Sequence, residues 1–269
     1  TLVGDRPEII SEYDLQTPEL FTIPTKDNFL MPAQMLKPKN FNKTKKYPII
    51  FHVYGGPSAP TVFDRWQGHS LFYDNMLLEM GYLIVKFDHR ASTAKSKKLE
   101  NHVLRMMSGP IEREDIIDGI RWLKSKSYVD PNRVGVWGWS GGGSFTLNLM
   151  TNTEEFQAGV SVAPVTDWHY YDTKWAEFTM KRPIDNPDGY ENTSFVKTAK
   201  NLHGSLLLVH GTYDDNVHPQ NSWHFIDELV KANIDFDMMF YPMRKHGIAD
   251  DPARIHLYNK MLKFWKEKL

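Results

Sequence analysis

The sequence predicts an α/β fold in which helices cover both faces of a mainly parallel central sheet. Three observations lead to this prediction. Short apolar runs alternate with longer stretches of helical periodicity through most of the 269 residues. Several runs are apolar throughout, as strands buried on both faces of a parallel sheet are. The composition is that of a globular protein, with 41% hydrophobic and 24% charged residues.

The individual elements follow in order along the chain. Apolar runs predict strands at residues 47–53, 82–87, 133–137, 158–162, 205–210 and 235–241. Helical spacing predicts helices at residues 70–80 and 116–123, from residue 142 to about 150, and at 219–232 and 252–268. The last helix is expected to pack on the sheet through one apolar face that carries Ile255, Tyr258, Leu262 and Trp265. Strands joined in this way imply right-handed crossovers.

The chain is expected to form one domain at residues 21–269, preceded by a polar linker at residues 1–20. An aromatic stretch at residues 164–190 is expected to be an insertion over the sheet. Lys+Arg 32 against Asp+Glu 33 gives a net charge of −1, so nucleic acid is not an expected partner. No apolar run approaches the ~20 residues that span a bilayer. Because Cys is absent, disulfides, thiol catalysis and cysteine-based metal sites are excluded.

Residues 138–142 read Gly-Trp-Ser-Gly-Gly and match the Gly-x-Ser-x-Gly pattern of a nucleophile elbow. The motif follows a predicted strand and precedes a predicted helix, where a tight turn lifts Ser140 above the sheet. Glycine is needed around the serine because the strand and the helix leave no space for side chains. The motif in this place predicts the α/β-hydrolase fold, with Ser140 as the nucleophile. A glycine-rich turn without catalytic function is the alternative.

A serine hydroxyl becomes nucleophilic at neutral pH only with a base and an acid that orients the base. In this fold the acid follows a strand downstream of the serine. Asp214 comes after the apolar run at residues 205–210 and is the expected acid, with Asp215 as the alternative. Asp167 and Asp172 also follow a strand, but they lie within the aromatic stretch.

The expected base is His246, which lies between the predicted strand 235–241 and the last helix. His218 is too close to the acid to come from a separate loop. His224 and His256 fall within predicted helices, away from the loop end of the sheet. A histidine that merely lies in a surface loop is the alternative for His246.

The oxygen that becomes negative during acyl transfer needs two hydrogen-bond donors. The backbone N–H of Gly141, directly after the nucleophile, is the first expected donor. Tyr54 follows the strand 47–53 and offers its phenolic O–H as the second, unless it only packs. No His-Glu-x-x-His or comparable ligand cluster is present, so the expected mechanism uses no metal and no other cofactor.

Three segments resemble the dipeptidyl peptidase IV branch of the prolyl oligopeptidase family of serine peptidases: residues 138–142, 210–218 and 246–249. The second segment contains Asp-Asp-Asn-Val-His, a string specific to that branch. The resemblance runs from about residue 20 to the C-terminus. It implies the roles given above for four side chains: Ser140 as nucleophile, Asp214 as acid, His246 as base and Tyr54 as oxyanion donor.

The resemblance also implies which residues hold the substrate. It places Val165, Trp168 and Tyr171 in the pocket for the residue before the cleaved bond, with Val217 closing that pocket. Asn216 resembles the family's side chain that contacts the substrate backbone. An apolar, aromatic pocket suits a proline ring, which has no N–H to satisfy. Ordinary core packing is the alternative for these aromatic residues.

The chain departs from the family pattern in three places. Gly141 stands where the family usually has Tyr, which removes one aromatic wall of the pocket. Trp175 stands where the family has a second Tyr, and its larger ring is expected to fill that gap, which leaves the preference for proline open. Residues 88–91 read Asp-His-Arg-Ala in place of Asp-x-Arg-Gly.

The resemblance implies a serine exopeptidase whose catalytic domain, residues 21–269, hydrolyses peptide substrates after Pro or Ala near their N-terminus. It further implies an N-terminal β-propeller, absent from this chain, whose acidic residues bind the free amino group of the substrate. A homodimer and a periplasmic or otherwise extracytoplasmic location are additional expectations. An esterase of the same fold and a non-catalytic interaction domain are the alternatives.

Overall fold

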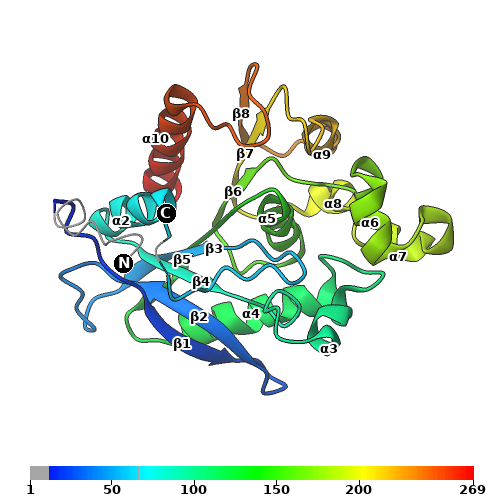
Figure 1. The fold of residues 1–269 in the computed structure, drawn as a ribbon. Coiled ribbons are helices and arrows are strands. Elements are labelled where there is room, and N and C mark those ends of the chain that lie inside the picture. The colour runs from blue at the N-terminus through cyan, green and yellow to red at the C-terminus, as the bar shows by residue number, and fades with distance from the viewer. Residues whose placement is uncertain (1–11, 66) are drawn as a thin grey trace, which may run out of the picture.

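One eight-stranded sheet runs through the computed structural model, which describes residues 12–65 and 67–269 (Figure 1). In sheet order the strands are β1 (Glu19–Pro24), β2 (Leu30–Leu36), β4 (Leu83–Phe87), β3 (Tyr47–His52), β5 (Val129–Trp139), β6 (Ala158–Val162), β7 (Ser205–Gly211) and β8 (Asp237–Tyr241). β2 pairs antiparallel with β1 and with β4, and every further pair in this order is parallel. The predicted α/β fold with a mainly parallel sheet is confirmed.

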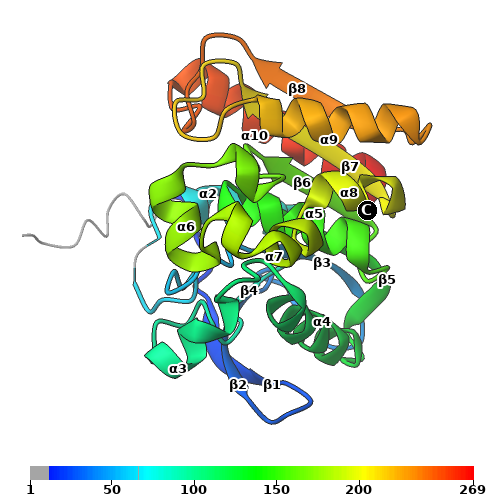
Figure 2. The same ribbon diagram turned by 90° about the vertical axis from the view of Figure 1, so that its right-hand side faces the viewer.

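Helices cover both faces of this sheet (Figures 1 and 2). One face packs against α2 (His69–Glu79) and α10 (Asp251–Lys268). The opposite face packs against α4 (Pro110–Lys124), α5 (Gly141–Asn152) and α9 (Gln220–Lys231). Shorter helices are α3 (Lys97–Glu100), α6 (Thr173–Met180), α7 (Pro187–Asn192) and α8 (Phe195–Thr198).

Successive side chains of the middle strands enter the two cores alternately. In β3, Ile50 packs in the cluster formed with α2 and α10, whereas its neighbours Ile49 and Phe51 pack with α4 and α5. Both faces of the strand are therefore buried, which explains why its sequence is a continuous apolar run. The loops that carry the candidate site lie at the carboxyl ends of these parallel strands.

The last helix, α10, packs on the sheet through three of the four residues expected on its buried face. Trp265 is fully buried, and Tyr258 and Leu262 pack, partly buried, against the same core. Ile255 is the exception and is 61% exposed. The buried side chains are Ala253, Leu257, Met261, Phe264 and Trp265. Two positions along a helix turn a side chain to nearly the opposite side, so Ile255 points away when Leu257 points inward. The helix carries apolar residues on more than one side, and spacing alone could not tell which side is covered.

β1 and β2 form a hairpin at one edge of the sheet that the sequence analysis did not predict (Figure 2). Its register pairs Glu19 with Met35 and Pro24 with Leu30. β1 starts inside the segment expected to be a linker, of which residues 1–11 lie outside the described residues. Proline is uncommon inside sheets, and the prolines of both strands obscured the pattern.

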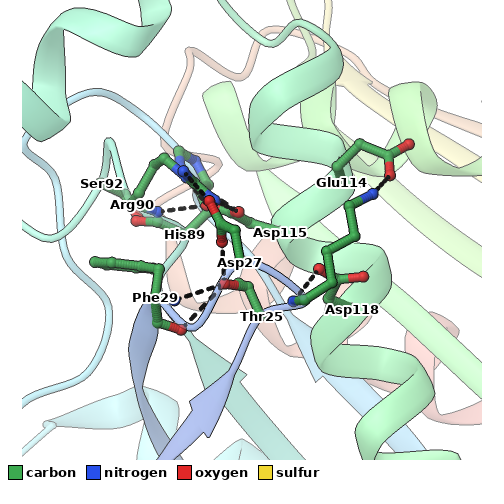
Figure 3. A network of polar contacts seen from close by, with 10 residues as sticks. Thr25, Asp27, Phe29, His89, Arg90, Ser92, Glu114, Asp115 and Asp118 are labelled. Atoms are coloured by element: carbon green, nitrogen blue, oxygen red, sulfur yellow. Dashed lines mark hydrogen bonds and ion pairs between the residues drawn. The ribbon is translucent and has the colours of Figure 1, made fainter.

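Arg90 ties this hairpin to the rest of the domain (Figure 3). Its guanidinium donates to Asp27, between β1 and β2, at 2.9 Å and to Asp115 of α4 at 2.6 Å. Asp115 is only 1% exposed. Arg90 thus forms a cross-link between the hairpin and α4.

The aromatic stretch at residues 164–190 folds into short helices, among them α6 and α7, to one side of the sheet (Figure 1). Its buried side chains, among them Val165 and Trp168, share an apolar cluster with Val103 and Met107. Within residues 12–65 and 67–269, no helix combines the length and the apolarity that crossing a membrane requires.

Candidate active site

Ser140 occupies the turn between β5 and α5. Its backbone angles are φ 58° and ψ −120°, a conformation that residues other than glycine rarely adopt. The Ser140 N–H donates to the Val162 carbonyl of β6 at 2.8 Å, which fixes the turn against the neighbouring strand. The turn therefore presents a partly exposed serine at the carboxyl edge of the sheet.

Close backbone packing explains two of the glycines in this motif. A Cβ on Gly138 would lie 2.3 Å from the backbone carbon of Gly142, and one on Gly142 would lie 2.2 Å from the Val53 carbonyl oxygen. Neither distance is tolerated in a packed protein. A Cβ on Gly141 would meet Tyr54 Cζ at 3.6 Å, which is an ordinary contact. Position 141 therefore has room for a side chain.

The loops after β7 and β8 bring Asp214 and His246 together. His246 Nδ1 lies 2.8 Å from Asp214 Oδ2. The Asp214 side chain is fully buried, and its Oδ1 accepts the backbone N–H groups of Asn216 and Val217 at 2.9 and 2.8 Å. The His246 side chain is 21% exposed. A fixed, buried carboxylate thus orients an imidazole that solvent can reach.

A second histidine, which the sequence analysis did not single out, contacts the same carboxylate. His210 is fully buried, and its Nε2 lies 3.1 Å from Asp214 Oδ2 and 2.8 Å from the Val217 carbonyl oxygen. Its Nδ1 lies 2.7 Å from Ser222 Oγ. Two acceptors at Nε2 require a proton there, so in the neutral ring Ser222 donates to Nδ1. The signal in the sequence was a histidine that ends an apolar strand.

Hydrogen bonds set the charge of Asp214. Burial by itself would raise the pKa of this carboxyl group. Hydrogen bonds from His210, His246 and the Asn216 N–H outweigh burial and hold the pKa of Asp214 well below its usual value. Asp214 is therefore ionised at neutral pH, and its carboxylate can accept a hydrogen bond from the Nδ1–H of His246.

The alternative acids and bases have other surroundings. Asp215 is exposed and pairs with Lys245 at 2.9 Å. Asp167 and Asp172 cap short helices of the segment 164–190. The other histidines considered lie against aromatic side chains: His218 against Trp223, His224 against Tyr170 and His256 against Tyr241.

Trp139 connects the loop that carries His246 to the turn that carries Ser140. Its indole N–H donates to the His246 carbonyl oxygen at 2.9 Å. Among the described residues the Ser140 hydroxyl forms no hydrogen bond with the His246 ring. Trp139, which directly precedes the serine, therefore links the backbone of the His246 loop to the Ser140 turn.

Tyr54 begins the loop after β3 and faces the same space as Ser140. The residue is 39% exposed, and loss of hydration raises the pKa of its phenol above the usual value. The hydroxyl consequently keeps its proton at neutral pH. Gly55 has φ 76°, and a Cβ there would lie 2.4 Å from a ring carbon of Phe145. The loop is thus pressed against α5, with Tyr54 held beside the serine.

A cavity of about 40 Å³ opens beside Ser140. Its lining includes Tyr54, Gly141 and four of the residues expected to hold the substrate: Val165, Trp168, Tyr171 and Trp175. The sequence analysis did not assign a role in the site to six further lining residues: Gly55, Gly56, Pro57, Met107, Ser108 and Phe145. They come from separate loops and from α5, and no local motif connects them with the serine.

Two other expected substrate residues lie outside this lining. Val217 is fully buried in the same apolar cluster as Val165 and Trp168. Asn216 is exposed, and its Oδ1 accepts the Tyr171 hydroxyl at 3.1 Å. Val217 therefore supports the cavity wall from behind, and Asn216 fixes the orientation of Tyr171.

The fold and the strand–turn–helix around Ser140 define the class of the protein, a serine hydrolase of the α/β-hydrolase fold. Residues 70–269 match the sequence profile of the prolyl oligopeptidase family. The chain belongs to this family.

Similar proteins indicate to which branch of that family the chain is related. The chain is 37% identical over 262 residues to the protein of Emericella nidulans named "Probable dipeptidyl-aminopeptidase B", a match that covers 96% of this chain and 28% of that protein. It superposes on the crystal structure of Porphyromonas gingivalis dipeptidyl peptidase 4 with a TM-score of 0.94 at 34% identity, covering 98% of this chain and 37% of that one. The resemblance to the dipeptidyl peptidase IV branch is confirmed, and the chain spans little more than a quarter of the fungal relative.

Proposed function

We propose that this chain is the catalytic domain of a serine peptidase that cleaves peptides after Pro or Ala, near their N-terminus, through Ser140, Asp214 and His246. The observation that carries the proposal is the 2.8 Å contact between His246 Nδ1 and the buried Asp214 carboxylate, on a loop tied to the Ser140 turn. The names of the similar proteins support the class of substrate.

The arrangement of the three side chains assigns each a step. Asp214 is ionised and holds the Nδ1–H of His246, which leaves Nε2 as the unprotonated nitrogen. His246 Nε2 takes the proton of Ser140 as the serine oxygen attacks the substrate carbonyl carbon. The same nitrogen then returns the proton to the departing amine. Water then attacks the carbonyl carbon of the acyl-enzyme while His246 Nε2 takes a proton from it. The same nitrogen passes that proton to the serine oxygen, which leaves as the restored Ser140.

Two donors would stabilise the negative oxygen of the intermediate. The Gly141 N–H lies at the start of α5, where backbone N–H groups are free and the helix favours negative charge. The Tyr54 hydroxyl, which keeps its proton because its pKa is raised, lines the same cavity. Removal of one such donor costs about 3–4 kcal/mol of transition-state stabilisation.

The cavity supports selection of a small apolar ring. Its walls are mainly aromatic and aliphatic, which suits a ring that has no polar group to satisfy. Gly141 and Trp175 both line it, which supports the expectation that the indole occupies the space that Gly141 leaves. On this proposal, the pocket has an indole where the family pattern has a tyrosine ring, and it holds the Pro or Ala side chain of the substrate.

Labelling with a fluorophosphonate tests the proposed mechanism. We expect covalent modification of Ser140, located by peptide mass spectrometry, and a loss of about 1,000-fold or more in the labelling rate in His246→Ala and Asp214→Asn. Asp227→Asn is the matched control, because Asp227 is exposed on α9 and pairs with Lys231 at 2.7 Å, and it should label at the rate of the unmodified chain. A folded chain that does not label at Ser140 would overturn the proposal.

A further inference from the structure

The side chain of Arg254, on α10, lies against the loop that carries His246. Its Nη2 donates to the Gly247 carbonyl oxygen at 2.5 Å, and its Nε donates to the Ile248 carbonyl oxygen at 3.0 Å. The planar fork of a guanidinium suits two neighbouring acceptors of this kind. Arg254 therefore holds the two residues that directly follow His246.

The same guanidinium lies over Trp139, with Cζ 5.1 Å from the centre of the indole ring. Trp139 in turn donates its indole N–H to the His246 carbonyl oxygen at 2.9 Å. Three consecutive carbonyl groups, at residues 246–248, are thus bound by two side chains that stack on each other. One of these side chains directly precedes Ser140.

The loop needs such support because its backbone is strained. Ile248 is fully buried with φ 41°, a value that β-branched residues rarely adopt. Arg244, on the same loop, donates from its guanidinium to the Asp250 carboxylate at 3.0 Å. No carboxylate among residues 12–65 and 67–269 forms such a pair with Arg254, whose donors go to the backbone instead.

We propose that Arg254 is a positioning residue for His246. It couples the His246 loop to Trp139 and so sets where the imidazole stands relative to the Ser140 hydroxyl. The inference rests on the proposed function, since it assigns a role in the same proton transfer. Displacement of a reacting group by about 1 Å can lower a rate by about 100-fold.

The test compares Arg254→Ala and Arg254→Lys with the unmodified 269-residue chain. The measured quantities are the first-order rate of Ser140 modification at saturating fluorophosphonate and the reagent concentration at half-saturation. We expect the saturating rate to fall about 10- to 100-fold in Arg254→Ala, with the half-saturating concentration unchanged. Arg254→Lys keeps the charge and the stem but loses the fork, so it should recover only part of the rate.

Arg121→Ala is the matched control, because Arg121 is exposed on α4 and its guanidinium binds Glu155 at 2.7 Å. Its saturating rate should equal that of the unmodified chain. If Arg254→Ala fails to fold, the Lys variant carries the comparison. Equal saturating rates in the unmodified chain and in the folded Arg254 variants would overturn the inference and leave the proposed function standing.

Proton NMR separates failure of this inference from failure of the proposed function. The His246 Nδ1–H bonded to Asp214 should give a downfield signal that is lost in His246→Gln. We expect this signal to broaden by exchange with water in Arg254→Ala, even if no chain labels with fluorophosphonate. A signal equally sharp in Arg254→Ala, or absent from the unmodified chain, would overturn the positioning role.

Discussion

At the scale of single residues, the geometry of the Ser140 turn depends on Gly138 and Gly142, whose surroundings differ from those of Gly141. A Cβ added to Gly138 or to Gly142 would lie only 2.2–2.3 Å from backbone atoms. Gly141 faces only a tyrosine ring at 3.6 Å. The position at which the family usually has a side chain is thus the one that has space for it.

Two alanine substitutions distinguish these positions. We expect Gly142→Ala to lower the free energy of unfolding by about 1–3 kcal/mol or more, because backbone atoms cannot move away as a flexible side chain can. Gly141→Ala should leave stability within about 1 kcal/mol, because the site is open and alanine favours a helix start over glycine. Urea unfolding of both variants gives the comparison, and equal losses would contradict the packing described for residue 142.

The sequence predicted Ser140, Asp214 and His246 from motif and order, because these residues lie where successive strands end. It could not predict His210 or Arg254 as their neighbours. His210 lies only four residues before Asp214, but its signal was no more than a histidine at the end of an apolar strand. Arg254 reaches the site from the first turns of α10, and tertiary packing alone determines that contact.

At the scale of elements, Arg90 holds the β1–β2 hairpin by two carboxylates of unequal burial. Arg90→Ala would leave the buried Asp115 without its partner, and we expect a loss of about 3–5 kcal/mol. Amides of β1 and β2 should exchange faster with solvent, since Asp27 is released as well. Lys26→Ala breaks only the exposed pair with Glu114 and should leave the free energy of unfolding almost unchanged. A similar loss in both variants would contradict the anchoring role of Arg90.

The start of α4 carries a carboxyl group that should make stability depend on pH. Glu112 accepts the Gly109 N–H at 2.6 Å and is 1% exposed, and its burial raises the pKa from 4.5 to about 8. Between these two values the folded chain keeps a proton that the unfolded chain loses, so stability falls as the pH rises. Each pH unit in that interval costs about 1.4 kcal/mol.

Glu112→Gln removes this titration while an amide oxygen can still accept the Gly109 N–H. We expect the melting temperature of the unmodified chain to fall relative to the variant from about pH 5 to about pH 8, and the difference to stay constant above that. Thermal melts followed by circular dichroism across this range provide the measurement. Parallel profiles for the two proteins would contradict a protonated Glu112.

The sequence predicted the parallel part of the sheet well and its antiparallel edge not at all. Strands buried on both faces read as apolar runs, and β6 begins and ends where the run predicted. β1 and β2 lie at the edge, include Pro24 and Pro32, and alternate between buried and exposed positions irregularly. The buried residues of this hairpin, such as Ile23 and Met31, pack against distant residues of α4, which leaves a weak pattern in the hairpin's own sequence.

At the scale of the whole molecule, the lining of the cavity indicates which parts of a substrate this chain can bind. Among the described residues the lining of the cavity contains no Asp or Glu that could bind a free amino group. We therefore expect this chain to hydrolyse Ala-Pro-p-nitroanilide and its N-acetyl derivative with similar kcat/KM. A preference above about tenfold for the free amine would contradict this expectation.

The site residues are made in the order Tyr54, Ser140, Asp214 and His246, and β8, next to the last of them, is also the outermost strand at its edge of the sheet. During translation the nucleophile therefore exists long before the histidine that activates it. On the proposed mechanism, a chain that stops before residue 246 lacks the base for Ser140 and cannot cleave peptides. The order of synthesis therefore separates the nucleophile in time from the histidine that would activate it, and the two meet only when β8 and α10 close this edge of the fold.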